Sequence, residues 1–554
     1  MAEMLSPGVF VTEVDASTIV PSVSNSIAVF SGNFDKGPVG KYILITSVDE
    51  LVTFYGEPSN SNYNEWYQAY NFLQYGNKLL VSRAANVGGT ATAVVNFVEE
   101  VEGTAIAVGT EEIEVEDTTD LSVGDYIVFD DATDGGANLD NIYVITTIDA
   151  VNNTIQLDRG LDEAIGGNGN LVVYSVEVAM NGVYEATSSV GEAVANDYEY
   201  LGKNMIIPNF DRFEEYETSI AFTNATDSKI KFMSRNPGDW CEDLEIAVAT
   251  PSAFDAESPS YAFDGIALDD LFDYYPTGTE VAIIVKSGDV IVESWKVDFD
   301  TTAKDQNGKS TYIENVINNG SSYIYVKDNT ANTDMVKDYC FQVDGTNGIT
   351  ITLKGGKDSD IQADDLLDAY EIFDNKEELD IDIVIANEVD GGVSAKNLVD
   401  TRKDCIAFIG ANSSDVVGKK SSIAVSNLVT WRKTGDLNYN NMFVVACANY
   451  KYQYDRYADK YRWVNIAGDI AGLRAQTSTN RASWWASAGL ERGQIKNVTK
   501  LAFNPTQGHR DILYKNGLNP ICSFPGQGTV MWGFDNLWLH VKNSLNCWNI
   551  LRAA

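Results

Sequence analysis

The sequence is poor in the residues from which most enzyme and metal sites are built. Its 554 residues include only two histidines, His509 and His540, and six cysteines without a C-x-x-C pair. It contains no H-E-x-x-H zinc motif, no G-x-S-x-G nucleophile motif and no G-x-x-x-x-G-K-S/T phosphate loop. The Gly-rich run at 166–170 and the acidic run at 130–135 are interpreted as turns, because both lack the context of a phosphate or calcium loop. We therefore expect no enzyme activity, no cofactor and no metal.

Long apolar runs are also missing. No run approaches the roughly 20 residues needed to cross a bilayer. The opening MAEMLSPG has neither the basic nor the apolar region of a signal peptide. The widely spaced cysteines fit a reducing compartment. We expect neither membrane insertion nor secretion.

Positive charge is scarce and unevenly placed. The chain has 80 Asp and Glu against 39 Lys and Arg, a net charge of −41. Residues 91–350 hold 49 acidic and 12 basic residues, whereas residues 401–554 hold 9 acidic and 19 basic ones. Direct nucleic-acid binding is not expected, because it needs clustered Lys and Arg. Either the acidic region only keeps the chain soluble, or it faces solvent while the basic end meets acidic partner surfaces.

The length exceeds what one hydrophobic core supports. Strands alternating with amphipathic helices occur near both ends of the chain, and short strands separated by turns lie between them. The predicted fold class is α+β multidomain, with an α/β core split by a long insertion that contains a β-barrel-like module and a second α+β module. The predicted segments are an extended arm (1–20), the α/β core (21–90 plus 350–510), the β-rich module (91–180), the α+β module (181–349) and a C-terminal segment (511–554).

Residues 8–20, GVFVTEVDASTIV, have the alternation of a strand between Pro7 and Pro21. A terminal strand with this many apolar residues needs a sheet edge to pair with. That edge belongs either to its own domain or to another subunit, through β-augmentation. The candidate interface residues of the arm are Val9, Phe10, Val11, Val14, Ile19 and Val20.

Aromatic and charged residues are concentrated at the start of the stretch Asn449–Gly493. So much aromatic area, interleaved with Lys and Arg, indicates either a core element or a protein contact surface. The candidate core or lattice contacts are Tyr450, Tyr452, Tyr454, Arg456, Arg462 and Trp463. A helix of small residues, including Gly468 and Gly472, is predicted at Ile466–Gln476, where another backbone must come close.

Asp469 lies inside this small-residue helix and is a further candidate contact. It is either an exposed carboxylate or a buried acid paired with Arg462, Arg474 or Arg492. The basic end of the chain supplies a candidate surface for an acidic partner. Its residues are Lys496, Lys500, Arg510 and Lys515.

A succession of motifs resembles the tail sheath proteins of contractile-tail bacteriophages, of the large T-even-like type. The resemblance covers roughly residues 1–90 and 350–533. It is carried by Asn449–Asp459 (NYKYQYDRYAD), Arg462–Leu473 (RWVNIAGDIAGL), Ala488–Lys496 (AGLERGQIK), Asn71–Asn77 (NFLQYGN), Leu5–Val9 (LSPGV) and Thr46–Gly56 (TSVDELVTFYG). After Gly533 the composition departs from the continuation that the family leads one to expect, and we read the C-terminal segment as shortened.

The resemblance implies a structural subunit of the virion that is made in the host bacterial cytoplasm. It implies rings of six subunits, stacked helically around a tail tube, that contract and drive the tube through the host envelope for genome delivery. The implied partners are other copies of the chain, the tail tube protein, and the baseplate and tail terminator proteins. The alternative function is a β-module adhesin or carbohydrate-binding surface protein, which the missing signal peptide disfavours.

Overall fold

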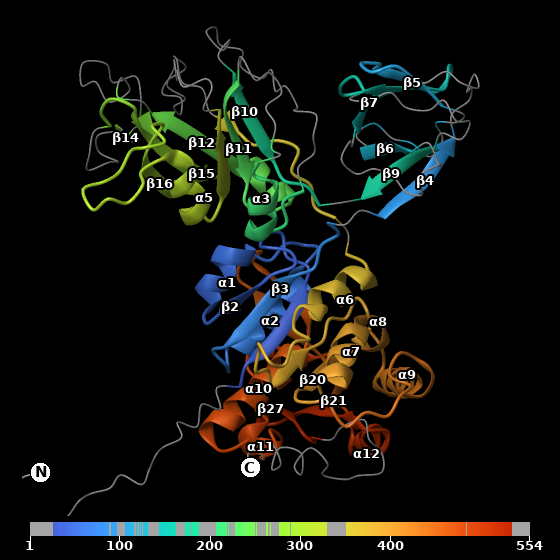
Figure 1. Cartoon of the computed structure of the whole chain (residues 1–554). Helices are drawn as coiled ribbons and strands as arrows, with labels where there is room; N and C mark the ends of the chain where they lie inside the picture. The colour runs from blue at the N-terminus through green and yellow to red at the C-terminus, as the bar shows by residue number, and fades with distance from the viewer. Residues whose placement is uncertain are drawn as a thin grey trace, which may run out of the picture.

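The computed structural model describes most of the chain between residues 26 and 534 (Figure 1). The residues in this range that it does not describe are 88–89, 97–105, 116–117, 119–120, 122, 124–125, 131–142, 162–171, 178, 188–205, 219, 221–227, 250, 252–261, 264–265, 268–275, 289, 330–350, 360 and 484. The predicted arm at 1–20 lies outside the described residues, as does the part of the C-terminal segment after Phe534.

Seven strands form the central sheet, in the order β2-β3-β1-β19-β20-β21-β25. Neighbouring strands are parallel, except that β2 and β3 are antiparallel. The strands are β1 (Ala28–Gly32), β2 (Tyr42–Ile45), β3 (Leu79–Arg83), β19 (Ile383–Ile385), β20 (Ile406–Gly410), β21 (Val444–Cys447) and β25 (Leu518–Asn519). Because β1 pairs with β19, chain segments from both sides of the acidic region lie in one sheet.

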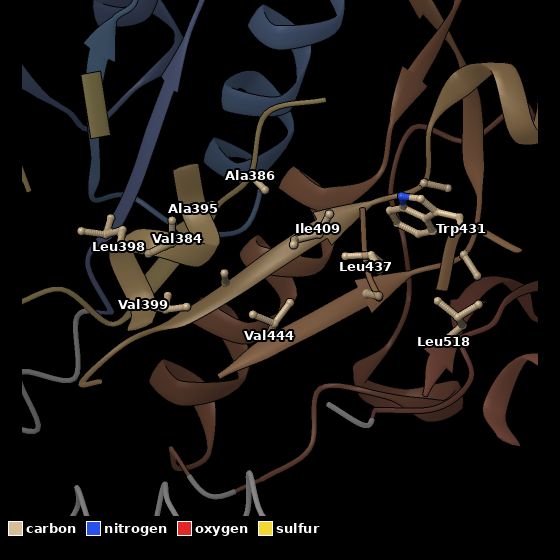
Figure 2. Packing of buried hydrophobic residues seen from close by; sticks show 14 of the residues in the cluster. Val384, Ala386, Ala395, Leu398, Val399, Ile409, Trp431, Leu437, Val444 and Leu518 are labelled. Atoms are coloured by element: carbon tan, nitrogen blue, oxygen red, sulfur yellow. The ribbon is translucent and has the colours of Figure 1, made fainter. Parts of the chain in front are cut away.

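Helices cover both faces of this sheet, as is usual for parallel strands. Successive residues of β20 point to opposite faces, so Phe408 joins one apolar cluster and Ile409 the other. Figure 2 shows Ile409 and Val444 of the sheet beside Leu398 and Trp431 of the covering helices. Helices α6 (Ala363–Glu371), α7 (Val393–Arg402), α9 (Ser421–Thr434) and α12 (Gln507–Lys515) pack on this face, and α1 (Val48–Tyr55), α2 (Tyr63–Leu73) and α10 (Ala467–Asn480) pack on the other.

The region between β3 and α6 contains several antiparallel sheets and a few short helices. A six-stranded sheet has the order β4-β9-β6-β7-β8-β5, and its strands are β4 (Thr90–Asn96), β5 (Glu112–Glu114), β6 (Tyr126–Asp130), β7 (Tyr143–Asp149), β8 (Thr154–Leu157) and β9 (Val172–Glu177). Among the described residues no strand pairing joins β4 to β5. Closure of this sheet into a barrel therefore remains a prediction.

The second part of this region has three- and four-stranded sheets, β10-β11-β17 and β16-β15-β12-β18. A two-stranded sheet, β13-β14, accompanies them. The helices and strands of this second part are β10 (Val183–Thr187), α3 (Phe210–Tyr216), β11 (Ser228–Ser234), η1 (Asp239–Asp243), β12 (Leu244–Ala249), β13 (Ala262–Phe263), β14 (Ile266–Ala267), β15 (Glu280–Ser287), β16 (Val290–Asp298), α5 (Ile313–Gly320), β17 (Ile324–Asp328) and β18 (Ile351–Thr352). The chain is thus a mixed α/β protein with several separate sheets.

The remaining short elements lie beside the central sheet. A three-stranded sheet has the order β23-β22-β24, and a two-stranded sheet pairs β26 with β27. These elements are β22 (Tyr450–Asp455), β23 (Lys460–Asn465), α8 (Ser413–Val416), α11 (Gly489–Arg492), β24 (Lys500–Leu501), β26 (Ile521–Phe524) and β27 (Gly528–Met531).

Candidate functional site

The hairpin β22–β23 buries three of its charged residues and exposes two of its tyrosines. Lys451, Asp455 and Arg462 are buried, at 0%, 0% and 9% exposure. Tyr454 and Tyr461, which pair across the two strands, are exposed by 48% and 49%. Side chains alternate between the faces of a strand, so Tyr452 and Tyr454 share the outer face, while Tyr450 at the start of β22 is buried. The hairpin is therefore anchored by polar contacts and presents its rings outward.

An ion pair between Arg462 and Asp455 fixes the inner face of the hairpin to α2. Arg462 Nε lies 2.6 Å from Asp455 Oδ2, and the Tyr67 hydroxyl of α2 donates a hydrogen bond to Asp455 Oδ1 at 2.7 Å. Burial alone would raise the pKa of Asp455, but hydrogen bonds from Tyr67 and Arg462 lower it below its usual value. Asp455 is thus held as a carboxylate inside the fold.

A second buried ion pair joins the hairpin to α10. Lys451 Nζ lies 2.9 Å from Asp469 Oδ2, and the Tyr75 hydroxyl donates to Asp469 Oδ1 at 3.2 Å. Burial lowers the pKa of Lys451 and raises the pKa of Asp469, while their mutual attraction opposes both shifts. Lys451 also donates to the Lys496 carbonyl at 3.3 Å, so three segments meet here.

This pairing corrects the predictions for Asp469. The carboxylate is 1% exposed, so the interpretation as an exposed group is wrong. It is a buried acid, but its partner is Lys451 and none of the three arginines that the sequence suggested. Two of those arginines donate hydrogen bonds to backbone carbonyls instead. Arg474 donates to the carbonyls of Ser483 and Trp485, and Arg492 donates to the carbonyl of Ala486.

Helix α10 approaches α2 closely at its glycines, as its small residues predict. A Cβ placed on Gly468 would lie 2.1 Å from the Gln68 carbonyl oxygen of α2. A Cβ on Gly472 would lie 2.7 Å from the Tyr75 ring. The absence of side chains here is what lets the two helices pack, and the helix extends to Asn480 rather than ending at Gln476.

The outer face of the hairpin is a continuous row of rings. Tyr452 stacks on Tyr461 with centroids 5.4 Å apart, and it contacts Trp463 at 4.8 Å. The Lys500 ammonium lies 4.6 Å from the Tyr452 ring centroid. A cation over an aromatic face is stabilised by the ring quadrupole. Among the described residues no further aromatic ring is stacked on this row from outside.

The other predicted site residues lie in different surroundings. Tyr450 is 1% exposed and is a core residue, with its hydroxyl bound to Glu388. Arg456 lies over the ring of its neighbour Tyr457, 4.9 Å from the centroid. Lys496 donates to the Gln74 carbonyl at 2.6 Å. Each of the two cations is therefore already engaged by groups of the same chain.

The last two predicted basic residues, Arg510 and Lys515, both lie on α12. The Arg510 guanidinium lies 5.8 Å from the Trp532 ring centroid, and Lys515 is exposed. No contact in the described structure joins them to Lys496 or Lys500. A single basic surface made of all four residues stays a prediction.

Sequence reasoning missed the polar junction between the central sheet and the region that follows it. Arg83, at the end of β3, is 1% exposed and donates to the Pro237 carbonyl at 2.5 Å and to Asp358 Oδ1 at 2.7 Å. Burial raises the pKa of Asp358 to about 8, and Arg83 opposes that shift. A basic residue directly after the apolar strand LLVS is the one signal that could have drawn attention to it.

Within the described residues no three or more His, Cys, Asp and Glu side chains are grouped as metal ligands would be. The four described cysteines, at 241, 405, 447 and 522, are buried free thiols. None of the described helices has the length and apolarity to traverse a bilayer. The candidate site is therefore the partly exposed row of rings on the hairpin β22–β23, which lies over the two buried ion pairs.

Comparison with known proteins gave three kinds of match. The family model described as the phage tail sheath protein central domain matches residues 360–536. The tail sheath protein of Vibrio phage KVP40 is 28% identical, over 96% of this chain and 82% of its own length. The tail sheath protein of Enterobacteria phage T4 is 29% identical, over 96% of this chain and 81% of its own. A solved sheath tail protein from Desulfitobacterium hafniense superposes with a TM-score of 0.43 at 7% identity, over 98% of this chain and 80% of its own.

Proposed function

We propose that this chain, a relative of the tail sheath proteins of T-even-like bacteriophages, is a structural subunit of a contractile phage tail sheath. The observation that carries this function is similarity to two tail sheath proteins over 96% of the chain. The resemblance inferred from the sequence motifs is confirmed by these matches. The alternative function, an adhesin or carbohydrate-binding protein, finds no support among them.

The assembly that we propose is a helical polymer of this chain around a tail tube, with six subunits in each ring. A head-to-tail contact that does not close into a ring of its own propagates a helix. The tube protein, the baseplate and the tail terminator would be its partners in the virion, after synthesis in the host cytoplasm. No direct contact with nucleic acid and no membrane insertion is part of this proposal.

We propose that the arm at 1–20 tethers neighbouring subunits while their cores move. Its apolar positions, which include Val9, Val11 and Val14, would add a strand to a sheet edge of another copy. Each backbone hydrogen bond contributes about 0.5–1.5 kcal/mol net, so several of them would hold the subunits together. Contraction then needs two packings of the same subunits, with the contracted one lower in free energy.

The outer face of the hairpin β22–β23 is our candidate for a rigid contact within the lattice. Its half-exposed Tyr454 and Tyr461 offer large contact area at a small cost in side-chain entropy. The buried pairs beneath it, Lys451–Asp469 and Arg462–Asp455, hold the strands in place before any partner arrives. The basic residues from Lys496 to Lys515 would face the tube or a neighbour.

The finer domain scheme is likewise proposed. The core would consist of residues 21–90 and 350–510, which supply the strands of the central sheet up to β21. The acidic modules at 91–180, which we propose is barrel-like, and at 181–349 would project away from the lattice, because their net charge would repel close neighbours. A role without catalysis fits the absence of any catalytic motif from the sequence.

Electron microscopy of the purified full chain tests this function directly. We expect helical tubes under assembly conditions, and a contracted form of the tube after mild destabilisation. Separate particles under every assembly condition, together with measurable turnover of a small compound, would contradict the proposal.

A further inference from the structure

A pocket of about 340 Å³ lies at the junction between the central α/β part and the acidic region. One wall comes from the segment 36–54, which contains β2 and most of α1. The opposite wall comes from residues 209–211, 235–236 and 321–325. Ligand sites in proteins have volumes of roughly 300–1,000 Å³ and often lie between domains. The pocket therefore has the size and place of a small-molecule site.

Three cations line this pocket. Lys36 is 7% exposed, and its ammonium donates to the Thr53 carbonyl at 3.2 Å. Arg235 lies with its guanidinium 4.4 Å from the Tyr325 ring centroid and donates to the Asn318 carbonyl at 2.7 Å. Lys41, the third cation, forms an ion pair with Asp211 at the rim. Burial lowers the pKa of Lys36 to about 8, and its ammonium lies 3.6 Å from the Tyr323 ring centroid. Among the described residues neither Lys36 nor Arg235 forms an ion pair with a carboxylate.

The charges that line the pocket favour a negative charge in its occupant. Glu293 acts on Lys36 and Arg235, whereas Asp211 and Glu214 act on the lining residue Tyr325. The carboxylate oxygens of Glu293 accept hydrogen bonds from the Ser321 hydroxyl at 2.6 Å and the Ser322 amide at 2.7 Å. The residues that line the pocket are three bases and one acid, Asp211, so the lining itself has a net charge of +2.

The other walls of the pocket are apolar and flat. Tyr42, Ile43, Phe54 and Phe210 contribute rings and an aliphatic chain to the lining. Such walls bury a planar ring, because aromatic faces pack well against rings and aliphatic groups. The lining thus combines two cations with an apolar slot.

We propose that this pocket binds a small aromatic monocarboxylate. Lys36 and Arg235 hold the carboxylate, and Ile43, Phe54 and Phe210 enclose the ring. One cation belongs to the central α/β part and the other to the acidic region, so the bound ligand bridges the two. This proposal is independent of the proposed sheath function, because ligand binding is measured on unassembled chains.

Calorimetric titration of the full chain with 2-naphthoate tests the proposal, with the neutral 2-naphthamide as the matched ligand. We expect saturable binding of the acid, and at least about tenfold weaker binding of the amide, because a hydrogen bond to a charged group contributes substantially. Equal binding of acid and amide, or no binding of the acid up to its solubility limit, would overturn the proposal. This comparison uses the unmodified chain and does not depend on the folding of a variant.

Substitutions of the lining cations then test which residues bind the carboxylate. Lys36→Met and Arg235→Met should each weaken naphthoate binding about tenfold, while Arg235→Lys should retain most of the affinity. Lys309→Met is the control, because Lys309 is exposed and does not line the pocket, and we expect less than about a threefold effect. Unchanged affinity in both methionine variants, with unaltered melting temperatures, would refute the assigned site.

Discussion

Lys451 and Asp469 form an ion pair in the interior, with the ammonium 2.9 Å from both carboxylate oxygens and side chains exposed by 0% and 1%. The lysine comes from the strand β22 and the aspartate from the helix α10. Removing one partner would leave a buried charge without compensation, whereas an apolar replacement of both would not.

Lys451→Met should therefore destabilise the chain by about 3–5 kcal/mol. The double variant Lys451→Met/Asp469→Leu should recover most of that loss, because no buried charge remains. Chemical denaturation measures both. Lys460→Met is the control, since Lys460 is an exposed lysine of the same hairpin. The single variant Asp469→Leu completes the cycle. A double variant as unstable as the sum of the two single ones would show that the two charges do not stabilise each other, and would contradict the prediction.

Gly468→Ala should be strongly destabilising, although alanine normally favours a helix. The added methyl group would meet the backbone carbonyl of Gln68 at 2.1 Å, so α10 and α2 would have to separate. We expect a loss of roughly 1–3 kcal/mol in the free energy of unfolding. Gly508→Ala in α12 is the matched control, because nothing lies within 4 Å of its Cβ position. That variant should be neutral or stabilised by up to about 1 kcal/mol, and equal effects at both sites would contradict the close-packing argument.

Stability should fall between about pH 4.5 and pH 7 because of Glu65. Burial raises the pKa of this 6% exposed carboxyl from 4.5 to about 7, with the charge of Glu388 adding to the shift. The folded chain then binds the proton more tightly than the unfolded chain. The resulting stabilisation is complete below the unfolded pKa and is lost as the pH rises through the folded pKa, by up to about 3 kcal/mol.

Glu65→Gln should flatten this part of the pH profile, since glutamine keeps the shape of the neutral acid. Unfolding free energies measured at several pH values between 4 and 8 check the slope. The exposed Glu57→Gln serves as control. A profile with the same slope in the Glu65 variant would assign the pH dependence to other groups.

Deleting residues 1–20 should give a folded, soluble monomer that cannot form sheath. The described fold begins after the arm, at Ser26, so the central sheet keeps all seven strands. Circular dichroism would check the fold, and electron microscopy would check assembly. Tubes formed by the shortened chain would rule out the tether.

Contraction of assembled tubes should not depend on ATP. The sequence has no phosphate-binding loop, and the free-energy difference between two packings supplies the driving force. Tubes triggered with and without ATP should shorten to the same extent. An ATP requirement would place a nucleotide site in the lattice.

Periodicity in the sequence was enough to predict much of the fold around the candidate site. Apolar runs such as FVVACA indicated buried strands, and the small residues around Gly468 indicated a helix pressed against another backbone. The partner of Asp469 was not predictable, because a lysine in a strand is expected to face solvent. Lys451 is buried against Asp469, on the opposite side of β22 from the partly exposed Tyr452 and Tyr454.

The sequence by itself indicated the alternation of strands and helices near both ends of the chain and the small-residue helix around Gly468, because periodicity and turn residues are local properties. The hairpin β22–β23 and helix α12 were seen only in the structure. It also determined the lack of enzyme motifs and the resemblance to tail sheath proteins. Only the tertiary structure decided which buried charges meet, such as Arg83 with Asp358, because these partners are 275 residues apart. Pairing at that distance depends on how sheets and helices pack, and no local pattern encodes it.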